Sequence, residues 1–355
     1  MAHMVGVMLS RGILQKGVRG RRTFEKLELY VKAARELGAG IVFFEPGGVR
    51  LKSGHVLGYV PGAGGKLARS AVPIPKAVHK RGLYSQRRDV SVVRALEKRG
   101  VHVFNPEDRL DKYAIHRLLA SDPELAPYLP ETVLLQRGAF AWFKRQLKER
   151  GEVFVKPRRG SLGIGVARVV RVGSNRYRYE SRKMRRTTTL AGAWRLVRKG
   201  RRRHILQQGI PLLEDDGRRI DLRVPVQKDG SGEWRTAGIA AKRAERSPFL
   251  TNLARGGSVH DGPALLARHF GERRGREIIL EIELLARRVA ETLNAKHPRL
   301  VDLGLDVGVD AGGHPYLIEV NRRDLRILFE HSGQRAALEE LYKNPIAYGL
   351  SVVGR

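Results

Sequence analysis

Two carboxylates and one amide near the end of the sequence could hold a metal ion. Glu319 and Asn321 are two residues apart in a predicted strand, so their side chains share one face, and Asp306 lies in the strand before it. A hairpin turn at 311–313 would place the two strands side by side. Such oxygen ligands suit Mg²⁺, which could bridge nucleotide phosphates. The alternative is a charged surface hairpin, although the apolar neighbours of Glu319 indicate burial.

A lysine at a strand end is followed by a glycine-rich loop. Lys156 ends a predicted strand that begins at 153, and the loop at 158–165 reads Arg-Arg-Gly-Ser-Leu-Gly-Ile-Gly. Glycine lets backbone N–H groups approach phosphate oxygens, and the lysine adds a positive charge. The loop is neither a Walker A loop nor a Rossmann turn, because no Gly-Lys-Ser/Thr opens a helix and a strand follows. The pattern is consistent with phosphate binding, and an ordinary turn is the alternative.

Three further segments carry weaker signals. Gln207 and Gln208 end a predicted strand at 204–208 that could offer backbone groups to an adenine edge, and Asp221 and Arg223 share one face of a later strand. A loop at 252–257 holds Arg255 between an asparagine and two glycines, and an arginine fork suits carboxylate or phosphate. Capped turns or ion pairs are the alternatives. We expect Asp302 and Asp310, close to the metal-binding pattern, to face solvent.

The positive charge is concentrated in one block. The chain has 355 residues and a formal net charge of +32, and residues 156–203 hold 17 Lys and Arg but a single acidic residue, Glu180. Such a block favours polyanions, whether nucleic acid, an acidic peptide or polyphosphate. The alternative is a solvated, arginine-rich surface.

Composition excludes several classes of protein. The chain has no cysteine, which excludes disulfide scaffolds, thiol nucleophiles and cysteine-ligated metal sites. We find no apolar run long enough to span a membrane, so we expect a cytoplasmic protein without a membrane partner. A hydrophobic fraction of 42% argues against wholesale disorder, and the length suggests two or three domains.

The predicted elements change character near Asn105. Strands at 5–9, 41–44 and 101–104 alternate with helices at 23–37 and 89–99, as in a small parallel α/β domain, with hairpins or loop at 54–75. After Asn105, a helix at 112–120 capped by Asp111 leads into strands mixed with helices at 140–149 and 190–199. We expect an irregular stretch at 246–262, a long helix at 277–293 and the final hairpin. This second region is predicted to be α+β with antiparallel sheets.

The order of these motifs resembles the ATP-grasp superfamily. The stretches DLRV, TNLARGG and GLDVGVD…YLIEVN resemble the glutamate ligases that modify ribosomal protein, and VGVMLSRGIL with the overall layout resembles the YheC/YheD-type, endospore coat-associated branch. The resemblance covers about residues 4–330. It implies an α/β plus α+β fold: an N-terminal parallel α/β domain (1–109), then a central lobe (110–210) and a C-terminal lobe (211–355) that clasp ATP between antiparallel sheets.

The resemblance also implies roles for single residues. Three groups follow: nucleotide contacts from Lys112, Lys156, Ser161, Gly163, Gln207, Gln208, Ile210, Asp221 and one or both of the pair Lys242-Arg243; Mg²⁺ or Mn²⁺ ligands from Asp306, Glu319 and Asn321; and acyl-phosphate contacts from Arg223, Asn252 and Arg255. The sequence departs from the ligases in two places. Asn321 is followed by Arg-Arg-Asp instead of a Pro-Gly turn, and Gln207-Gln208 replaces a glutamate in the adenine hinge.

The activity that this resemblance implies is ATP-dependent joining of a carboxylate to an amine through an acyl phosphate. The substrate is expected to be an amino acid or an acidic peptide, steered by the basic block. Two alternatives remain: a kinase that uses the same ligands, and a polyanion- or nucleic-acid-binding protein on a non-catalytic ATP-grasp scaffold. The resemblance further implies a link to sporulation.

Overall fold

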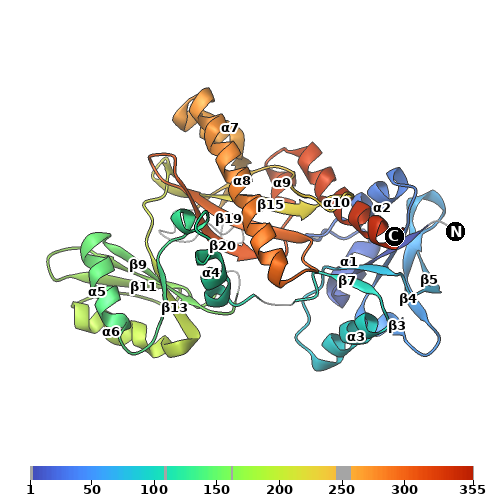
Figure 1. Cartoon of the computed structure of the whole chain (residues 1–355), viewed down its shortest axis with the longest axis horizontal. Coiled ribbons are helices and arrows are strands. Elements are labelled where there is room, and N and C mark those ends of the chain that lie inside the picture. The colour runs from blue at the N-terminus through green and yellow to red at the C-terminus, as the bar shows by residue number, and fades with distance from the viewer. Residues whose placement is uncertain (1–2, 108–109, 161–162, 245–256, 355) are drawn as a thin grey trace.

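A computed structural model describes residues 3–107, 110–160, 163–244 and 257–354. Three β-sheets follow one another along the chain. In Figure 1 the sheet of the C-terminal segment lies between the N-terminal sheet and the central one. The N-terminal sheet is mixed, and the other two sheets are antiparallel. Within the described residues, no helix is long and apolar enough to cross a membrane.

The N-terminal sheet has a parallel centre. Its strands are ordered β3-β4-β2-β1-β6-β7, and β5 pairs with β4. The parallel strands are β1 (Met4–Met8), β2 (Gly40–Phe44), β6 (Ala77–Lys80) and β7 (His102–Phe104); β3 (Val49–Arg50), β4 (His55–Pro61) and β5 (Leu67–Pro73) are antiparallel. The helices are α1 (Arg11–Val18), α2 (Leu27–Glu36) and α3 (Arg87–Lys98). The sequence analysis did not find α1 or β6, and the α3 helix begins after Gln86, not at Asp89.

The central sheet is antiparallel and covered on one face by helices. Its order is β12-β11-β10-β9-β13-β8. The strands are β8 (Thr132–Leu134), β9 (Glu152–Pro157), β10 (Ala167–Arg171), β11 (Tyr177–Ser181), β12 (Met184–Thr188) and β13 (His204–Gln208). Phe143 of α5 (Ala139–Glu149) and Ala193 of α6 (Leu190–Val197) pack with Val153 and Val169 of the sheet in one core. The helix α4 (Lys112–Ala120) begins as predicted, because the Asp111 carboxylate accepts hydrogen bonds from two amides of its first turn.

The C-terminal sheet has one apolar and one polar face. The order is β18-β17-β15-β19-β20, and β14 and β16 also pair with β15. Its strands are β14 (Glu214–Asp215), β15 (Arg218–Lys228), β16 (Trp234–Thr236), β17 (Ala240–Arg243), β18 (Ser258–Asp261), β19 (Asp302–Val309) and β20 (Pro315–Asn321). The apolar face packs against α7 (Gly262–Phe270) and α8 (Glu272–Lys296). The stretch predicted to be irregular ends in the strand β18, while residues 245–256 lie outside the described residues.

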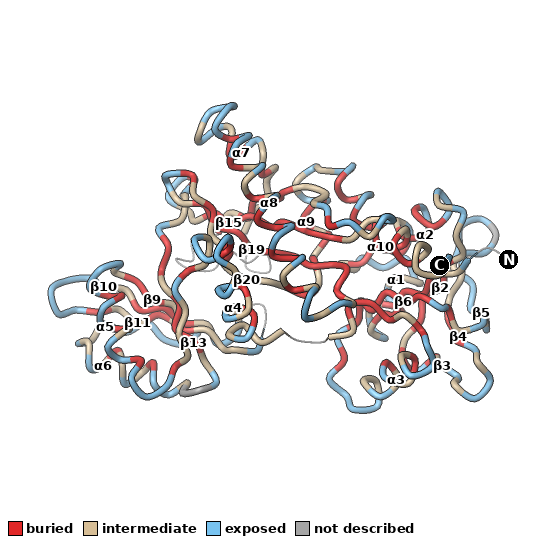
Figure 2. Tube along the Cα trace, in the orientation of Figure 1, coloured by how far each residue is buried: buried red, intermediate tan, exposed pale blue. Residues whose placement is uncertain are grey.

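The two ends of the chain share a hydrophobic core. The helices α9 (Ile327–His331) and α10 (Arg335–Val353) follow the last strand. Leu341 and Ile346 of α10 pack with Val5 of β1 and Tyr30 of α2, and all four side chains are buried. Figure 2 shows these buried stretches of α10 beside the N-terminal strands. The predicted boundaries at 109/110 and 210/211 stay predictions, and this core joins the first segment to the last.

Candidate functional site

The predicted metal-binding residues meet on the hairpin of β19 and β20. Asp306 pairs in register with Glu319, and the Asn321 amide donates a hydrogen bond of 3.0 Å to the second carboxylate oxygen of Asp306. The register shifts by a bulge between Asp306 and Val307. Two carboxylates and an amide therefore lie together, as the spacing predicted. Their role as metal ligands stays a prediction.

Cationic side chains surround Asp306 on the polar face of the sheet. The Lys242 ammonium lies 2.7 Å from the Asp306 carboxylate and 2.6 Å from that of Asp221, and the Arg223 guanidinium lies 3.2 Å from Asp306. Burial by itself would raise the pKa of Asp306, but the charges of Arg223 and Lys242 hold it below its usual value. These neighbouring charges therefore favour the ionised form of Asp306.

Lys112 contacts both a predicted metal ligand and the glycine-rich loop. Its ammonium donates a 2.6 Å hydrogen bond to the Gly160 carbonyl and lies 3.3 Å from the Glu319 carboxylate. Lys112 is the first residue of α4, so the Asp111 cap fixes where its side chain begins. Gly160 and Gly163 have φ angles of 146° and 65°, which other residues rarely adopt. Ser161, predicted to contact phosphate, lies outside the described residues.

Lys156 lies in the same electrostatic environment. Its ammonium donates a hydrogen bond to the Gln207 side chain across the pair β9 and β13. Burial lowers the pKa of Lys156; the Glu319 carboxylate opposes this effect, and the Lys112 charge adds to it. The structure thus brings the two predicted phosphate lysines and Glu319 close enough for their charges to interact.

The predicted adenine hinge is held within the central sheet. The backbone N–H of Gln208 donates a 2.8 Å hydrogen bond to the Glu131 carbonyl, and the backbone N–H of Gly209 donates one of 3.1 Å to the Glu152 carbonyl. The Ile210 side chain is buried. Adenine contacts from Gln207, Gln208 and Ile210 stay a prediction.

Arg243 is not brought to the site. Neighbouring residues of a strand point to opposite faces, so Lys242 reaches Asp306 whereas Arg243 turns away. The Arg243 guanidinium lies 2.9 Å from Asp215 and 3.2 Å from Asp216. Of the pair Lys242-Arg243, only Lys242 therefore lies beside Asp306, and its contact with phosphate stays a prediction. Asn252 and Arg255 lie outside the described residues.

The sequence analysis missed a buried ionic cluster behind the site. Asp302, predicted to face solvent, is fully buried: its carboxylate lies 2.7 Å from Arg81 and 3.0 Å from Arg326. Asp324 is also fully buried, with a carboxylate oxygen 3.8 Å from the Arg223 guanidinium. Burial raises the pKa of Asp324 to about 6. No local pattern could reveal this cluster, because Arg81 and Asp302 are 221 residues apart in the sequence.

The Arg-Arg-Asp segment after Asn321 is hydrogen-bonded to the residues that follow β6 in the N-terminal sheet. The Arg322 guanidinium donates to the Gly82 carbonyl at 3.1 Å, and Arg323 donates to the Arg81 carbonyl at 2.6 Å. The residues that replace the Pro-Gly turn of the ligases thus have a structural role. Asp310, also predicted to face solvent, is half-buried and accepts hydrogen bonds from turn amides.

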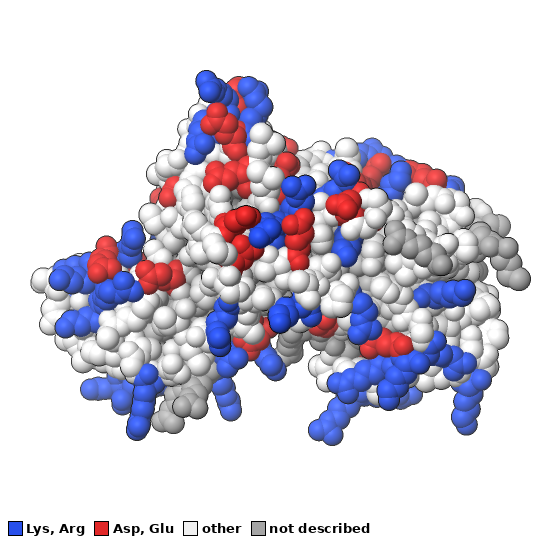
Figure 3. Space-filling view, in the orientation of Figure 1, with Lys and Arg blue, Asp and Glu red and all other residues white. Residues whose placement is uncertain are grey.

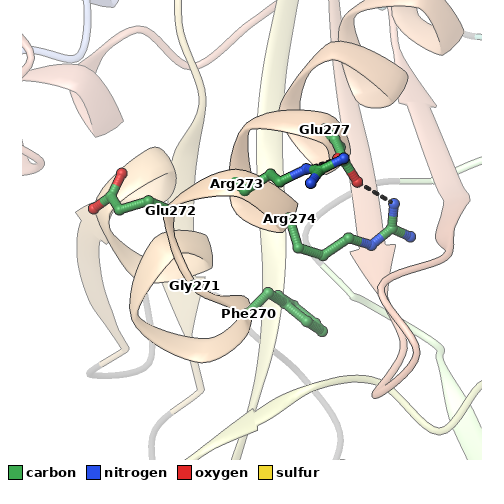
Figure 4. A pocket seen from close by; sticks show the side chains of 6 residues that line it. All are labelled: Phe270, Gly271, Glu272, Arg273, Arg274 and Glu277. Carbon is green, nitrogen blue, oxygen red and sulfur yellow. Dashed lines mark hydrogen bonds and ion pairs between the residues drawn. The ribbon is translucent and has the colours of Figure 1, made fainter.

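A hollow of about 490 Å³ lies elsewhere, where α7 meets α8. Figure 4 shows Arg273 and Arg274 of its lining both reaching Glu277. None of its lining residues belongs to the sheet face that carries Asp306. We therefore do not assign this hollow to nucleotide binding.

Comparison with known proteins identifies the family of this chain. The model of the YheC/D-like ATP-grasp family matches residues 100–352. The chain belongs to this family. The chain is similar to the endospore coat-associated protein YheD of Bacillus subtilis (strain 168), with 25% identity over 276 residues that cover 74% of this chain and 60% of YheD. The chain thus spans about three fifths of the length of this relative.

Solved structures share the fold at low sequence identity. D-cycloserine synthetase DcsG has a TM-score of 0.56 at 15% identity; the match covers 99% of this chain and 100% of DcsG. The ATP-grasp ligase PsnB, complexed with a phosphomimetic variant of its minimal precursor, Mg and ADP, has a TM-score of 0.52 at 15% identity; the match covers 98% of this chain and 99% of PsnB. The ATP-grasp scaffold of this family member thus extends over nearly the whole chain.

Proposed function

We propose that this YheC/D-like ATP-grasp protein is an ATP-dependent carboxylate–amine ligase that works through an acyl phosphate. The observation that carries the proposal is the position of Lys112, whose ammonium contacts both the glycine-rich loop at Gly160 and the metal-binding candidate Glu319. The side chain of Lys112 thus reaches both the candidate phosphate-binding loop and a candidate metal ligand. The similarity to PsnB, solved with Mg and ADP, supports the same arrangement.

In the proposed reaction, a carboxylate oxygen of the first substrate attacks the γ-phosphorus of ATP, and the bond to ADP breaks. An amine then attacks the carbonyl carbon of the acyl phosphate; phosphate leaves and the nitrogen loses a proton. Lys112, Lys156 and Lys242 would offset charge on the phosphate oxygens, since positioning and charge neutralisation dominate phosphoryl transfer. Arg223, whose guanidinium lies 3.2 Å from the Asp306 carboxylate, would bind the acyl phosphate.

The residues present fit a hard divalent cation. Asp306, Glu319 and Asn321 offer oxygen ligands, and neighbouring cations keep the Asp306 carboxylate ionised. A Mg²⁺ ion bound there would neutralise charge on the β- and γ-phosphates, and Mn²⁺ could replace it. The protein's own contribution is to hold these residues together on the paired strands β19 and β20.

Release of ADP tests the ligase reaction. Purified protein is incubated with ATP and Mg²⁺ and screened against pools of amino acids, acidic peptides and polyamines, with mass spectrometry of any product. We expect ADP release that needs both a carboxylate and an amine, together with a product whose mass equals the two substrates less one water. ADP formed equally well without an amine would identify a kinase instead.

Two finer assignments belong to the same proposal. The basic segment 156–203 favours an acidic substrate, such as an acidic peptide or protein tail. The similarity to YheD, an endospore coat-associated protein, supports a role linked to spores. No turnover with any acceptor, together with strongly salt-dependent DNA binding, would favour a polyanion-binding protein instead.

A further inference from the structure

The helix α8 has an apolar stripe that faces away from the protein. Leu280 and Leu284 are 60% and 59% exposed, although they lie one turn apart on a helix whose opposite face is fully buried. That opposite face includes Ile278, Ile282 and Val289, which pack in the core of the C-terminal sheet. Exposed leucines that lie singly need no explanation, but two that form one stripe on a long helix do.

The stripe extends beyond the leucines with a regular spacing. It consists of exposed residues, which in chain order are Arg273, Glu277, Leu280, Leu284, Arg287 and Glu291. The steps between them are four, three, four, three and four residues, which is the spacing of the seam in a coiled coil. At 100° per residue these positions stay within one narrow stripe along α8.

The charges along the stripe fit a second copy that runs in the opposite direction. If Leu280 faces Leu284 of another copy, then Glu277 faces Arg287 and Arg273 faces Glu291. Every charged side chain of the stripe thus faces a side chain of opposite charge in the other copy, and the two leucine positions face each other. A parallel pairing would instead place each charge against the same charge.

The charges on α8 permit the close approach of a second copy. The helix carries six basic and five acidic residues in a chain whose net charge is +32. Figure 3 shows acidic and basic side chains mixed over this part of the molecule. Within one copy, Arg273 already lies 3.2 Å from Glu277, and Arg287 lies 3.9 Å from Glu291. Pairing would bring these ion pairs together as groups of two arginines and two glutamates.

We propose that two copies of this protein associate through α8, with the two helices antiparallel. The two-fold axis between them passes α8 at the level of residue 282. The interface is isologous, because each copy contributes the same stripe. Its centre is the contact of Leu280 and Leu284 with their counterparts, and the charged pairs fix the direction and the register. This inference is independent of the proposed ligase activity.

Sedimentation equilibrium of the full chain tests the association. We expect a dimer for the parent protein and a monomer for Leu280→Glu and Leu284→Glu at the same concentration. Val172→Glu is the matched control, since Val172 is 41% exposed, lies in the central lobe and undergoes the same change of charge. A parent protein that stays monomeric up to its solubility limit would overturn the proposal.

Charge reversal tests the predicted register. Glu277→Arg alone and Arg287→Glu alone should each weaken the dimer, because like charges would then face each other. The two changes in one chain should restore it, since the pair is only exchanged. No recovery in the double variant would contradict the pairing of these two positions.

Cysteine crosslinking tests the direction of the two helices. The chain has no cysteine, so introduced thiols react without background. A mixture of Arg273→Cys and Glu291→Cys proteins should form a disulfide between copies under mild oxidation. Arg273→Cys alone should not, because two such positions are about 27 Å apart in the antiparallel pair. Efficient crosslinking of Arg273→Cys alone would show a parallel pair, and a parent dimer in which neither protein crosslinks would overturn the proposed α8 contact.

Discussion

At the scale of single residues, the site is organised by side chains that each serve two neighbours. Lys112 contacts the loop carbonyl of Gly160 and the carboxylate of Glu319. Arg223 lies between Asp306 and Asp324. Because each cation has two partners, removing one partner leaves the cation in place, and effects on activity and on stability can be separated.

Glu319→Ala is expected to lower ATP-dependent turnover by roughly a hundredfold or more, because an oxygen ligand of the proposed metal site is lost. The melting temperature should change little, since the Glu319 side chain is 26% exposed and its partner Lys112 keeps the Gly160 contact. ADP release and a thermal melt measure the two effects. Glu339→Ala, which removes a carboxylate on α10, is the control. Unchanged Mg²⁺-dependent turnover would remove Glu319 from the metal site.

Asp324→Asn is expected to change how stability depends on pH. Burial raises the pKa of Asp324 from 3.8 to about 6. Between these values the folded protein binds more protons than the unfolded chain, so the free energy of unfolding falls as pH rises from about 4 to 6. The contribution that is lost is about 1–3 kcal/mol. The asparagine variant, which cannot titrate, should lack this decrease in urea denaturation at pH 4.5 and 7.5. Parallel pH profiles would refute the assignment.

At the scale of elements, Asn105 connects β7 with β19 and with the segment after β20. Asn105 follows β7 and is buried with a φ angle of 55°, a conformation that asparagine tolerates better than most residues. Its side-chain oxygen accepts hydrogen bonds from the Val301 and Asp302 amides, and its nitrogen donates to the Arg322 carbonyl at 2.7 Å. Asn105 thus fixes the N-terminal sheet against β19 and the segment after β20.

Asn105→Ala should lower the free energy of unfolding by about 3 kcal/mol or more, because two buried amides lose their acceptor. Asn105→Gly separates the two causes of this loss. Glycine also lacks the side chain but adopts the positive φ freely, so it should be less destabilised than alanine by about 1 kcal/mol. Urea denaturation measures both variants. Values within a few tenths of a kcal/mol of the parent would show that these hydrogen bonds do not matter.

At the scale of the whole molecule, charge is distributed unevenly. Figure 3 shows lysine and arginine side chains along the N-terminal domain and over the lobe that holds the central sheet. In that lobe, Arg182, Lys183, Arg185 and Arg186 are exposed on β12 and the turn before it. The strand β12 is at the edge of the sheet, three strands from β9 with its Lys156. These charges are therefore suited to steering a substrate and not to direct nucleotide contact.

Replacing all four of these side chains by glutamine is expected to reduce the salt dependence of kcat/KM for an acidic substrate. Steering acts over about 8 Å at physiological salt, so it weakens as ionic strength rises. The salt dependence for ATP should change less, because short contacts bind it. Four exposed basic residues of α3 (Arg87, Arg88, Arg94 and Lys98) are the matched control. Equal salt slopes in parent and variant would leave the β12 cluster as solubilising surface.

The sequence by itself determined the features that depend on near neighbours. The two-residue period of a strand was enough to place Glu319 and Asn321 on one face, and a short turn was enough to bring Asp306 beside them. The Asp111 cap likewise predicted the start of α4 correctly. In each case the deciding interaction lies within a few residues, where backbone geometry leaves little choice.

Only the tertiary structure decided which polar groups are buried and which face each strand turns to the site. Asp302 was predicted from the sequence to face solvent, but its carboxylate is buried and forms ion pairs with Arg81 and Arg326. The choice of Lys242 over Arg243 depends on the register of β17 against β15, which Lys242 and Asp221 share. Burial of a charge is favourable only when a partner of opposite charge arrives from elsewhere in the chain, and a one-residue shift of register reverses the face of every side chain.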